Sequence, residues 1–164
     1  MITQMTDILE YTLGFIRQQI ADLSDEEMVL QPPGAPNHAA WTLGHLIHSC
    51  QAIAIELGKR TSSSTEWESR FGYGTRPNPV ASENLSKSSL LTNLAETSDR
   101  LRATIQALPT RLLDEPPSEG QMREMFPTMG HELMQVVVAH TAYHAGQLAA
   151  WRRAIGRAPV GVFV

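Results

Sequence analysis

The stretch His140-Thr-Ala-Tyr-His144 places two imidazole side chains one helical turn apart, inside an apolar stripe rather than on a charged face. Positions three and four residues apart share one face of an α-helix. The face that the pair occupies continues in both directions through Leu133, Val136, Val137, Gln147, Leu148 and Trp151. Buried imidazoles need polar partners. A divalent metal is one such partner, because this spacing suits two ligands of one ion, and hydrogen bonds to neighbouring side chains are the alternative.

Helical periodicity extends over four segments of the chain, and loops rich in Pro, Gly and Ser separate them. The segments are residues 3–23, 39–59, 83–108 and 128–155. Ser24 and Glu27 match a capping box, Asn37 is a plausible N-cap of the second segment, and Thr128 is one of the fourth. No run with the period of a β-strand exceeds a few residues. The sequence therefore predicts an all-α four-helix bundle.

The two later connections, residues 60–82 and 109–127, are long for a compact bundle and are expected to be irregular. Structureless loops of this length are uncommon and often functional. At 164 residues the chain has the length of one domain, and neither an internal repeat nor a linker divides it. We therefore expect residues 1–164 to form a single domain.

Composition and charge exclude several classes of partner. The net charge is −4 and the 13 Lys and Arg residues are dispersed, which argues against a nucleic acid. The chain has one cysteine, Cys50, so no intrachain disulfide is expected, and this is compatible with a reducing compartment. There is no basic start followed by an apolar run, and no apolar run of membrane-spanning length. We expect a cytoplasmic protein without a membrane partner.

A third ligand for the same ion is expected on the second helix, in Trp41-Thr-Leu-Gly-His45-Leu-Ile-His48. His45 and His48 differ in direction by about 60°, and either of them can reach a neighbouring helix. Gly44 leaves room beside His45 for a close approach. His38, at the start of the helix, is expected to cap it or to be exposed. His131 is two and a half turns before the histidine pair and is excluded from the same ion.

The segment from Trp41 to Leu46, followed after about a hundred residues by His140-xxx-His144-Ala-Gly-Gln-Leu148, resembles the DinB-like (damage-inducible) superfamily. The similarity includes Leu23-Ser-Asp-Glu-Glu-Met28 and Trp151-Arg-Arg-Ala-Ile-Gly156. Members of this family are four-helix bundles whose three histidines hold a divalent metal. The resemblance implies that His45, His140 and His144 are the metal ligands, and so favours His45 over His48. Ala145 is a departure, because members often carry Arg at that position.

The resemblance also implies a function. Related proteins transfer or isomerise with low-molecular-weight thiols such as bacillithiol or mycothiol, and they form homodimers. We therefore expect a metal-dependent thiol transferase or hydrolase that acts on a small electrophile. Zn, Ni, Mn and Fe all suit imidazole ligands. A non-catalytic metal or small-ligand sensor is the alternative, because no general acid or base stands out and no catalytic residue is assigned.

Several other side chains are candidates for a role near the pair. We expect Glu56 to be an exposed helix carboxylate and Tyr143 to pack in the core. Gln147 follows His144 by three residues and either supports it by a hydrogen bond or packs against a neighbouring helix. Tyr73 is expected to be a turn residue, with contact to a substrate as the alternative. Cys50 falls on an apolar stripe and is expected in the core.

Overall fold

The computed structural model describes residues 1–58, 65–117 and 121–161. Within those ranges all regular structure is helical and no strand occurs, so the predicted all-α class is confirmed. The elements are α1 (Ile2–Ile20), η1 (Glu27–Val29), α2 (Ala39–Glu56), α3 (Thr65–Phe71), η2 (Ala81–Glu83), α4 (Lys87–Gln106), η3 (Thr110–Asp114), α5 (Gln121–Met125), α6 (Met129–Leu133), η4 (Met134–His140) and α7 (Thr141–Ala154).

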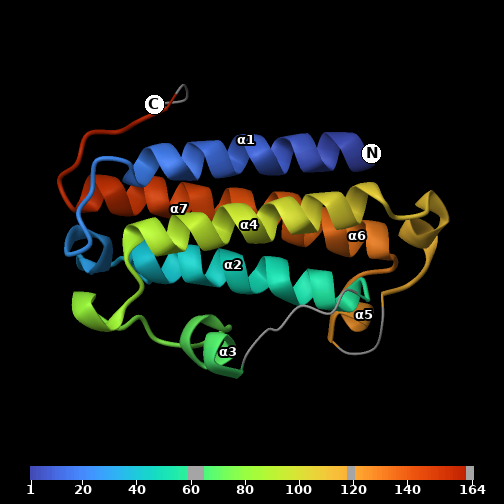
Figure 1. The fold of residues 1–164 in the computed structure, drawn as a ribbon, viewed down its shortest axis with the longest axis horizontal. Helices are drawn as coiled ribbons and strands as arrows, with labels where there is room; N and C mark the ends of the chain where they lie inside the picture. The colour runs from blue at the N-terminus through green and yellow to red at the C-terminus, as the bar shows by residue number, and fades with distance from the viewer. Residues whose placement is uncertain (59–64, 118–120, 162–164) are drawn as a thin grey trace.

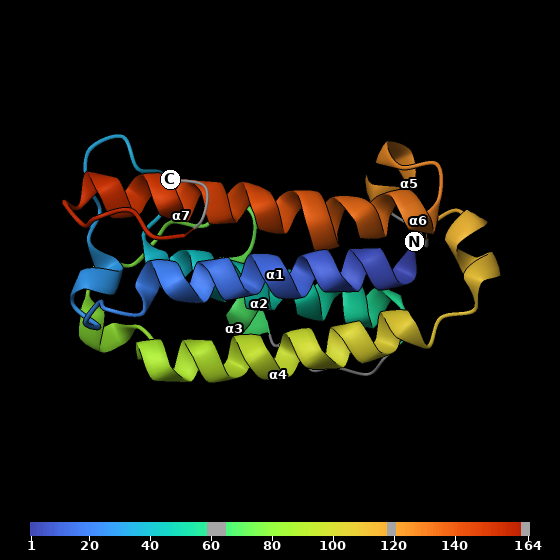
Figure 2. The ribbon, with the colours of Figure 1, turned by 90° about the horizontal axis from the view of Figure 1, so that it is seen from above.

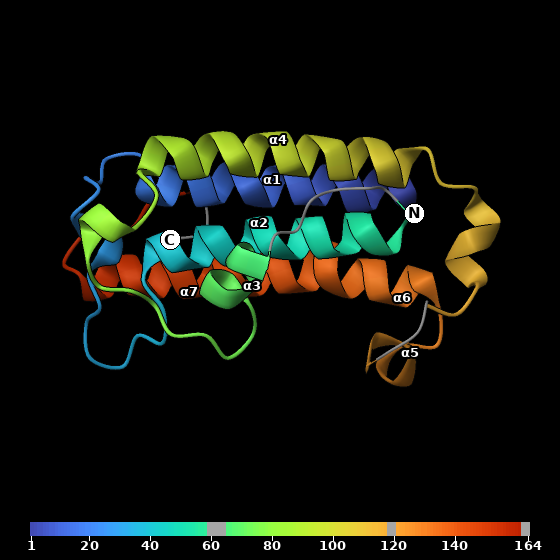
Figure 3. The same ribbon diagram turned by 60° about the horizontal axis from the view of Figure 1, so that its bottom comes forward.

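The long segments α1, α2, α4 and the continuous run from α6 to α7 lie side by side along the long axis of the molecule (Figure 1). Helix α2 packs against α4 and α7, and α1 packs against the same two helices. Seen from above, α1 lies between α4 and the α6–α7 run (Figure 2). The short helix α3 lies on the outside of α2, as Figure 3 shows, and it contacts α2. None of the described helices combines the length and the hydropathy that crossing a membrane requires.

The core forms where the apolar faces of the long segments meet. Large side chains with less than 2% exposure come from all four long segments and include Leu9 and Ile16, Leu43 and Ile47, Leu94 and Leu101, and Leu133 and Leu148. Each such side chain contributes about 1.5–3 kcal/mol when it is removed from water. This packing fixes α2 against its neighbours and so holds the histidine-bearing face of α2 in a constant position.

The connections contain more structure than the sequence predicted. Residues 60–82 were expected to be irregular, but they include α3 and the start of η2, while residues 60–64 lie outside the described residues. In the same way, residues 109–127 include η3 and α5, and 118–120 lie outside the described residues. Helix α3 contacts α2, and Phe71 is its one buried residue. Packing of this side chain against α2 explains why a helix forms here. Such packing depends on contacts that are distant in sequence.

Among the helix ends that differ from the prediction, three have an identifiable local cause. Helix α2 ends at Glu56, before Gly58 with a φ of 77°, and residue 59 lies outside the described residues. Helix α4 begins at Lys87 rather than at residue 83, because the Ser86 hydroxyl accepts a hydrogen bond from the amide of Ser89 at 3.2 Å. The capping box is confirmed, since the Ser24 amide donates to the carboxylate of Glu27 at 3.0 Å.

The third difference is the N-cap of α2, which is His38 and not Asn37. The Nδ1 atom of His38 accepts a hydrogen bond from the amide of Trp41 at 3.1 Å. Its Nε2 therefore carries the proton and donates to the carbonyl of Asn78 at 2.9 Å. His38 is 1% exposed, so the prediction of a capping role is confirmed and the prediction of exposure is wrong.

The predicted last helix is one continuous run whose middle part, η4, is π-helical. Thr128 caps its start as predicted, because its hydroxyl accepts from the amide of His131 at 3.4 Å. A π-helical turn takes more residues than an α-helical turn, and such turns are frequent at functional sites. Here the π-helical turns end at His140, immediately before α7.

Candidate metal centre

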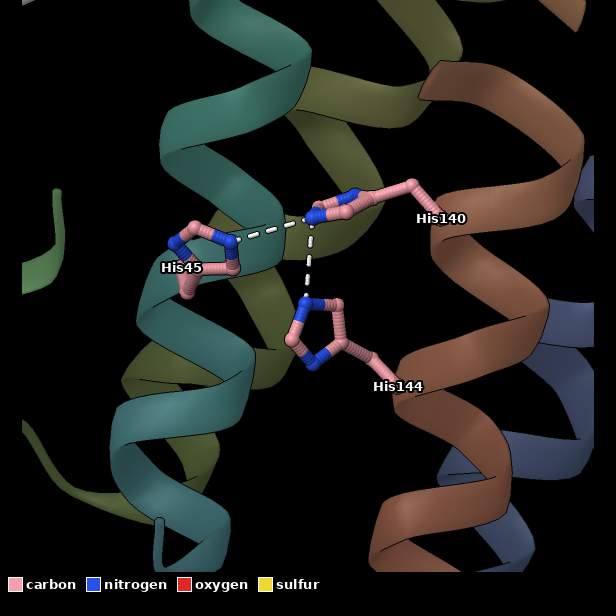
Figure 4. Close-up of side chains that lie close together, drawn as sticks. All are labelled: His45, His140 and His144. Atoms are coloured by element: carbon pink, nitrogen blue, oxygen red, sulfur yellow. Dashed lines mark hydrogen bonds between the residues drawn. The ribbon is translucent and has the colours of Figure 1, made fainter. Parts of the chain in front are cut away.

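Three histidines from distant parts of the sequence converge between α2 and the η4–α7 run (Figure 4). The Nε2 atom of His140 lies 3.1 Å from Nε2 of His45 and 3.0 Å from Nε2 of His144. One ring nitrogen from each residue lies within 4.8 Å of the others. Nitrogens bound to one tetrahedral zinc ion at about 2.0–2.1 Å are roughly 3.3 Å apart. The structure thus brings the three predicted residues together in an arrangement that could hold a single divalent ion.

The second nitrogen of His45 determines how its ring is presented. Nδ1 lies 2.7 Å from the carbonyl oxygen of Phe71, the last residue of α3. A carbonyl oxygen can only accept, so Nδ1 carries the proton and Nε2 directs its lone pair toward the other two histidines. A hydrogen bond from the outer nitrogen to a backbone carbonyl is usual for histidines that bind metals.

A glycine allows α3 to approach α2 closely enough for this bond. A Cβ atom at Gly44 would lie 2.3 Å from Cδ1 of Phe71, so any side chain there would clash with the phenyl ring. The indole of Trp41 stacks on the His45 ring with centroids 4.8 Å apart and an angle of 9° between the planes. The Trp41 Nε1 donates to the hydroxyl of Thr75 at 3.0 Å. The hydrogen bond to Phe71 and the stacking on Trp41 together fix the orientation of the His45 imidazole.

All three imidazoles are neutral near pH 7. Burial, followed by repulsion from His45, lowers the pKa of His140 to about 4. Burial, followed by repulsion from His140 and His45, lowers the pKa of His144 to about 3. Burial also lowers the pKa of His45, while the bond to Phe71 opposes the change. Neutral rings keep a lone pair available, which metal binding requires.

The outer nitrogens of the other two histidines lack a hydrogen bond like the one that orients His45. Nδ1 of His140 and Nδ1 of His144 are buried, and neither has a hydrogen-bond partner among the described residues. Gln147 is close enough to His144 to oppose part of the fall in its pKa, but the Oε1 atom of Gln147 also lacks a partner. A supporting role of Gln147 therefore stays a prediction.

A cavity of about 440 Å³ opens beside His45 and His140. Its walls, which are apolar over most of their area, are formed by His45, His48, Ser49, Ala52, Ile53, Glu56, Tyr73, Met125, Phe126, Glu132, Gln135, Val136 and His140. This volume is in the range of small-molecule sites. Another cavity, of about 270 Å³, lies between residues 33–37 and α7, and its lining has no titratable side chain. The larger cavity is therefore the one where a small molecule would meet the histidines.

Two carboxyl groups line the larger cavity, Glu56 and Glu132, and neither was predicted to be part of the site. Glu132 is 0% exposed, and the carboxyl group of Glu56 is its hydrogen-bond partner. Burial, together with a hydrogen bond to Glu56 and repulsion from it, raises the pKa of Glu132 to about 8. Since carboxylates only accept, the bond between the two groups needs a proton on one of them. Glu56 is half-buried, so its prediction as an exposed carboxylate is wrong.

The π-helical segment explains why Glu132 was missed. In a straight α-helix, eight residues separate Glu132 and His140 by two turns plus about 80°. A π-helical turn takes up about one extra residue, so the pair is offset by nearly two whole turns. Both side chains then line the same cavity. The apolar periodicity of the sequence carried no signal for this change of direction.

The remaining predicted residues divide between the site and its surroundings. His48 lines the cavity, but it is not part of the three-histidine cluster. His131 is exposed and bonded to Thr128, away from that cluster as predicted. Tyr143 is 63% exposed, so its predicted place in the core is wrong. Tyr73 is fully exposed and borders the cavity.

Cys50 is buried in the core, as predicted. It is 7% exposed, and burial raises the pKa of its thiol to about 12. A thiol with so high a pKa stays protonated at neutral pH and is a poor nucleophile. The nucleophile of any reaction in the cavity therefore has to come from another group.

Comparison with known families agrees with this geometry. The sequence model of the DinB superfamily matches residues 9–148, a range that contains all three histidines. Neither the curated proteins nor the solved structures gave a match. The match covers most of the chain, and the chain belongs to the DinB superfamily.

Proposed function

We propose that this protein binds a divalent transition metal through His45, His140 and His144 and that it acts as a thiol transferase or hydrolase on a small electrophile. The supporting observation is the convergence of three neutral imidazoles beside a cavity of small-molecule size. The metals proposed are Zn, Ni, Mn and Fe, which all accept imidazole ligands. A low-molecular-weight thiol is the proposed cofactor.

The neutral imidazoles of His45, His140 and His144 would hold the divalent ion, which would supply a Lewis acid that makes a thiol or a water more acidic. The protein's own residues prepare this site. The Phe71 carbonyl keeps the proton of His45 on Nδ1. The apolar side chains of Ile53 and Val136 line the cavity beside the histidines. This environment strengthens electrostatic interactions inside the cavity.

The finer points of architecture are part of the same proposal. We interpret α1, α2, α4 and the run from α6 to α7 as the four helices of one bundle in a single domain. We further propose that the protein is cytoplasmic and forms a homodimer. Light scattering that returns the mass of one 18.1 kDa chain across the accessible concentration range would contradict the dimer.

Metal analysis tests the proposed ligands directly. Protein purified without a metal-affinity tag is reconstituted in turn with Zn, Ni, Mn and Fe, and bound metal is measured by mass spectrometry. We expect about one ion per chain in the wild type, since three histidines form one site. The variants His45→Ala, His140→Ala and His144→Ala should lose it. His131→Ala is the matched control, because His131 lies in the same helical run but is exposed. A wild type that retains none of these metals would refute the site.

Activity is tested separately from metal content. Monochlorobimane and related electrophiles are offered with several low-molecular-weight thiols, and ester substrates are offered for hydrolysis. We expect turnover that is lost in chelator and restored by metal. Tight metal binding without turnover of any substrate would contradict the catalytic part and favour the non-catalytic sensor.

A further inference from the structure

Two buried polar atoms on α7 complement each other. They are Nδ1 of His144 and Oε1 of Gln147, and neither has a hydrogen bond to a third group within the described residues. In a neutral imidazole one nitrogen carries a proton and donates, whereas the oxygen of an amide only accepts. Each atom is therefore a partner that the other one needs.

The directions of the two side chains suit a bond between them. Residues three apart on an α-helix share a face, and their side chains lean toward the N-terminus of the helix. Gln147 therefore extends back over the turn that carries His144. The outer nitrogen of His144 lies on the side of the ring away from His140, in the direction in which α7 continues (Figure 4). The amide of Gln147 and this nitrogen thus face each other across one turn.

The pKa of His144 responds to Gln147 as it would to an acceptor. Burial, followed by repulsion from His140 and His45, lowers this pKa to about 3, and a side-chain hydrogen bond to Gln147 opposes the fall. A protonated imidazole donates from both nitrogens, so only an acceptor stabilises it. The oxygen of the Gln147 amide, rather than its nitrogen, therefore faces His144.

We propose that Gln147 is a positioning residue of the metal centre, whose Oε1 accepts a hydrogen bond from Nδ1 of His144 and so directs Nε2 of that ring at the metal. A neutral ring that binds a metal through Nε2 keeps its proton on Nδ1. A buried donor of this kind needs an acceptor. This role rests on the proposed function, and it extends the site to a residue beyond the three histidines.

The three ligands then differ in their outer hydrogen bonds. His45 donates to the backbone carbonyl of Phe71 at 2.7 Å. His144 donates to a side chain instead, while Nδ1 of His140 has no partner in the described part of the chain. Ordinary substitution removes a side-chain acceptor but not a backbone carbonyl. His144 is therefore the ligand at which the effect of an outer hydrogen bond can be measured directly.

Packing is the competing role for Gln147, because it also lines the smaller cavity beside Leu148 and Trp151. Two substitutions that keep its shape separate the roles. Methionine has a similar unbranched side chain but offers only a weakly accepting sulfur, whereas glutamate keeps an acceptor oxygen. A packing role predicts the same result for both substitutions, and a positioning role predicts different results.

Competition for Zn with a chromophoric chelator tests the role of Gln147. We expect Gln147→Met to bind Zn about tenfold more weakly than the wild type, since loss of an outer hydrogen bond typically lowers metal affinity 10–100-fold. Gln147→Glu should bind Zn at least as tightly as the wild type, because a carboxylate accepts more strongly than an amide. Gln18→Met, the same change at an exposed position of α1, is the matched control and should leave the affinity unchanged. Equal affinities of Gln147→Met and the wild type, or equal losses in Gln147→Met and Gln147→Glu, would overturn the proposal.

Nuclear magnetic resonance gives a second readout that does not need Gln147→Glu to fold. In the Zn-loaded wild type we expect slowly exchanging Nδ1–H signals from His45 and His144, because each proton is held in a hydrogen bond. In Gln147→Met the signal of His144 should be lost to exchange with water, while that of His45 remains. Circular dichroism checks that the variant folds. A His144 signal that is unchanged in Gln147→Met would also overturn the proposal.

The outcomes distinguish this proposal from the proposed function. A wild type that binds no Zn or other divalent metal refutes the metal site and the role of Gln147 with it. A wild type that binds Zn with an affinity that Gln147→Met keeps refutes only the role of Gln147.

Discussion

His45 donates a hydrogen bond from Nδ1 to the carbonyl oxygen of Phe71 at 2.7 Å, across 26 residues of sequence. This bond links a short helix in a long connection to the ring that faces the other two histidines. It fixes both the tautomer and the direction of the Nε2 lone pair. The connection between α2 and α4 therefore contributes to the site through its backbone as well as by covering α2.

Substitution of Gly44 by alanine should weaken metal binding. The new Cβ would overlap the Phe71 ring, move α3 away from α2 and break the bond to His45. Loss of such an outer hydrogen bond typically lowers metal affinity 10–100-fold, and we expect about tenfold. Competition with a chromophoric chelator measures the affinity. Gly146→Ala is the control, because no atom lies within 4 Å of its added Cβ, and it should bind metal like the wild type. Equal affinities of the two variants would contradict this role of Phe71.

Removal of metal should lower the melting temperature of the wild type. A ligand that binds only the folded state stabilises it by about 4 kcal/mol at a thousandfold excess over its Kd. For a chain of this size that corresponds to a shift of roughly 10 °C. Differential scanning fluorimetry with and without chelator measures the shift. His144→Ala should show none, and an equal shift in this variant would place the metal elsewhere.

Glu132→Gln should stabilise the protein at pH 8 and much less at pH 5. The pKa of Glu132 is raised from 4.5 to about 8 in the folded state, so the folded protein holds this proton after the unfolded chain has lost it. Stability from this group is complete below pH 4.5 and is lost as the pH rises toward 8. Glutamine does not ionise and avoids the loss, which we expect to be about 2 kcal/mol. Urea unfolding at the two pH values measures the difference, with Glu124→Gln as the exposed control. A gain of the same size at both pH values would contradict the raised pKa.

Arg152→Ala should destabilise the fold strongly. The guanidinium is 3% exposed and donates to the carboxylate of Asp22 at 2.6 and 2.9 Å and to the carbonyls of Gln19 at 2.7 Å and Ala158 at 2.6 Å. Removing it takes out a buried side chain and leaves the buried carbonyl of Gln19 without this donor, and we expect a loss of about 3 kcal/mol. The neighbouring exposed residue provides the control, Arg153→Ala, which should change stability by less than about 0.5 kcal/mol. Urea unfolding compares the two, and similar values would mean that the buried network contributes little.

Local sequence patterns predicted the parts of this protein that depend on neighbours along the chain. The apolar period of 3.6 residues located the long helices, and the spacing of His140 and His144 placed both rings on one face. The capping box at Ser24 and the cap at Thr128 were also readable, because a capping side chain bonds to an amide two or three residues away. Patterns of this kind did not predict α3, whose Phe71 is buried against a different helix.

What the sequence by itself determined was the all-α class, the face shared by His140 and His144, and the presence of further histidines on the second helix. The family resemblance already favoured His45 over His48, and the structure brings His45 to the pair. Only the tertiary structure decided that the Phe71 carbonyl orients the His45 ring and that Glu132 lines the same cavity as His140. The physical reason is that helical periodicity arises from hydrogen bonds between residues that are close together in the sequence. The directions of side chains between helices depend instead on packing and on one π-helical segment that changes the phase of a face.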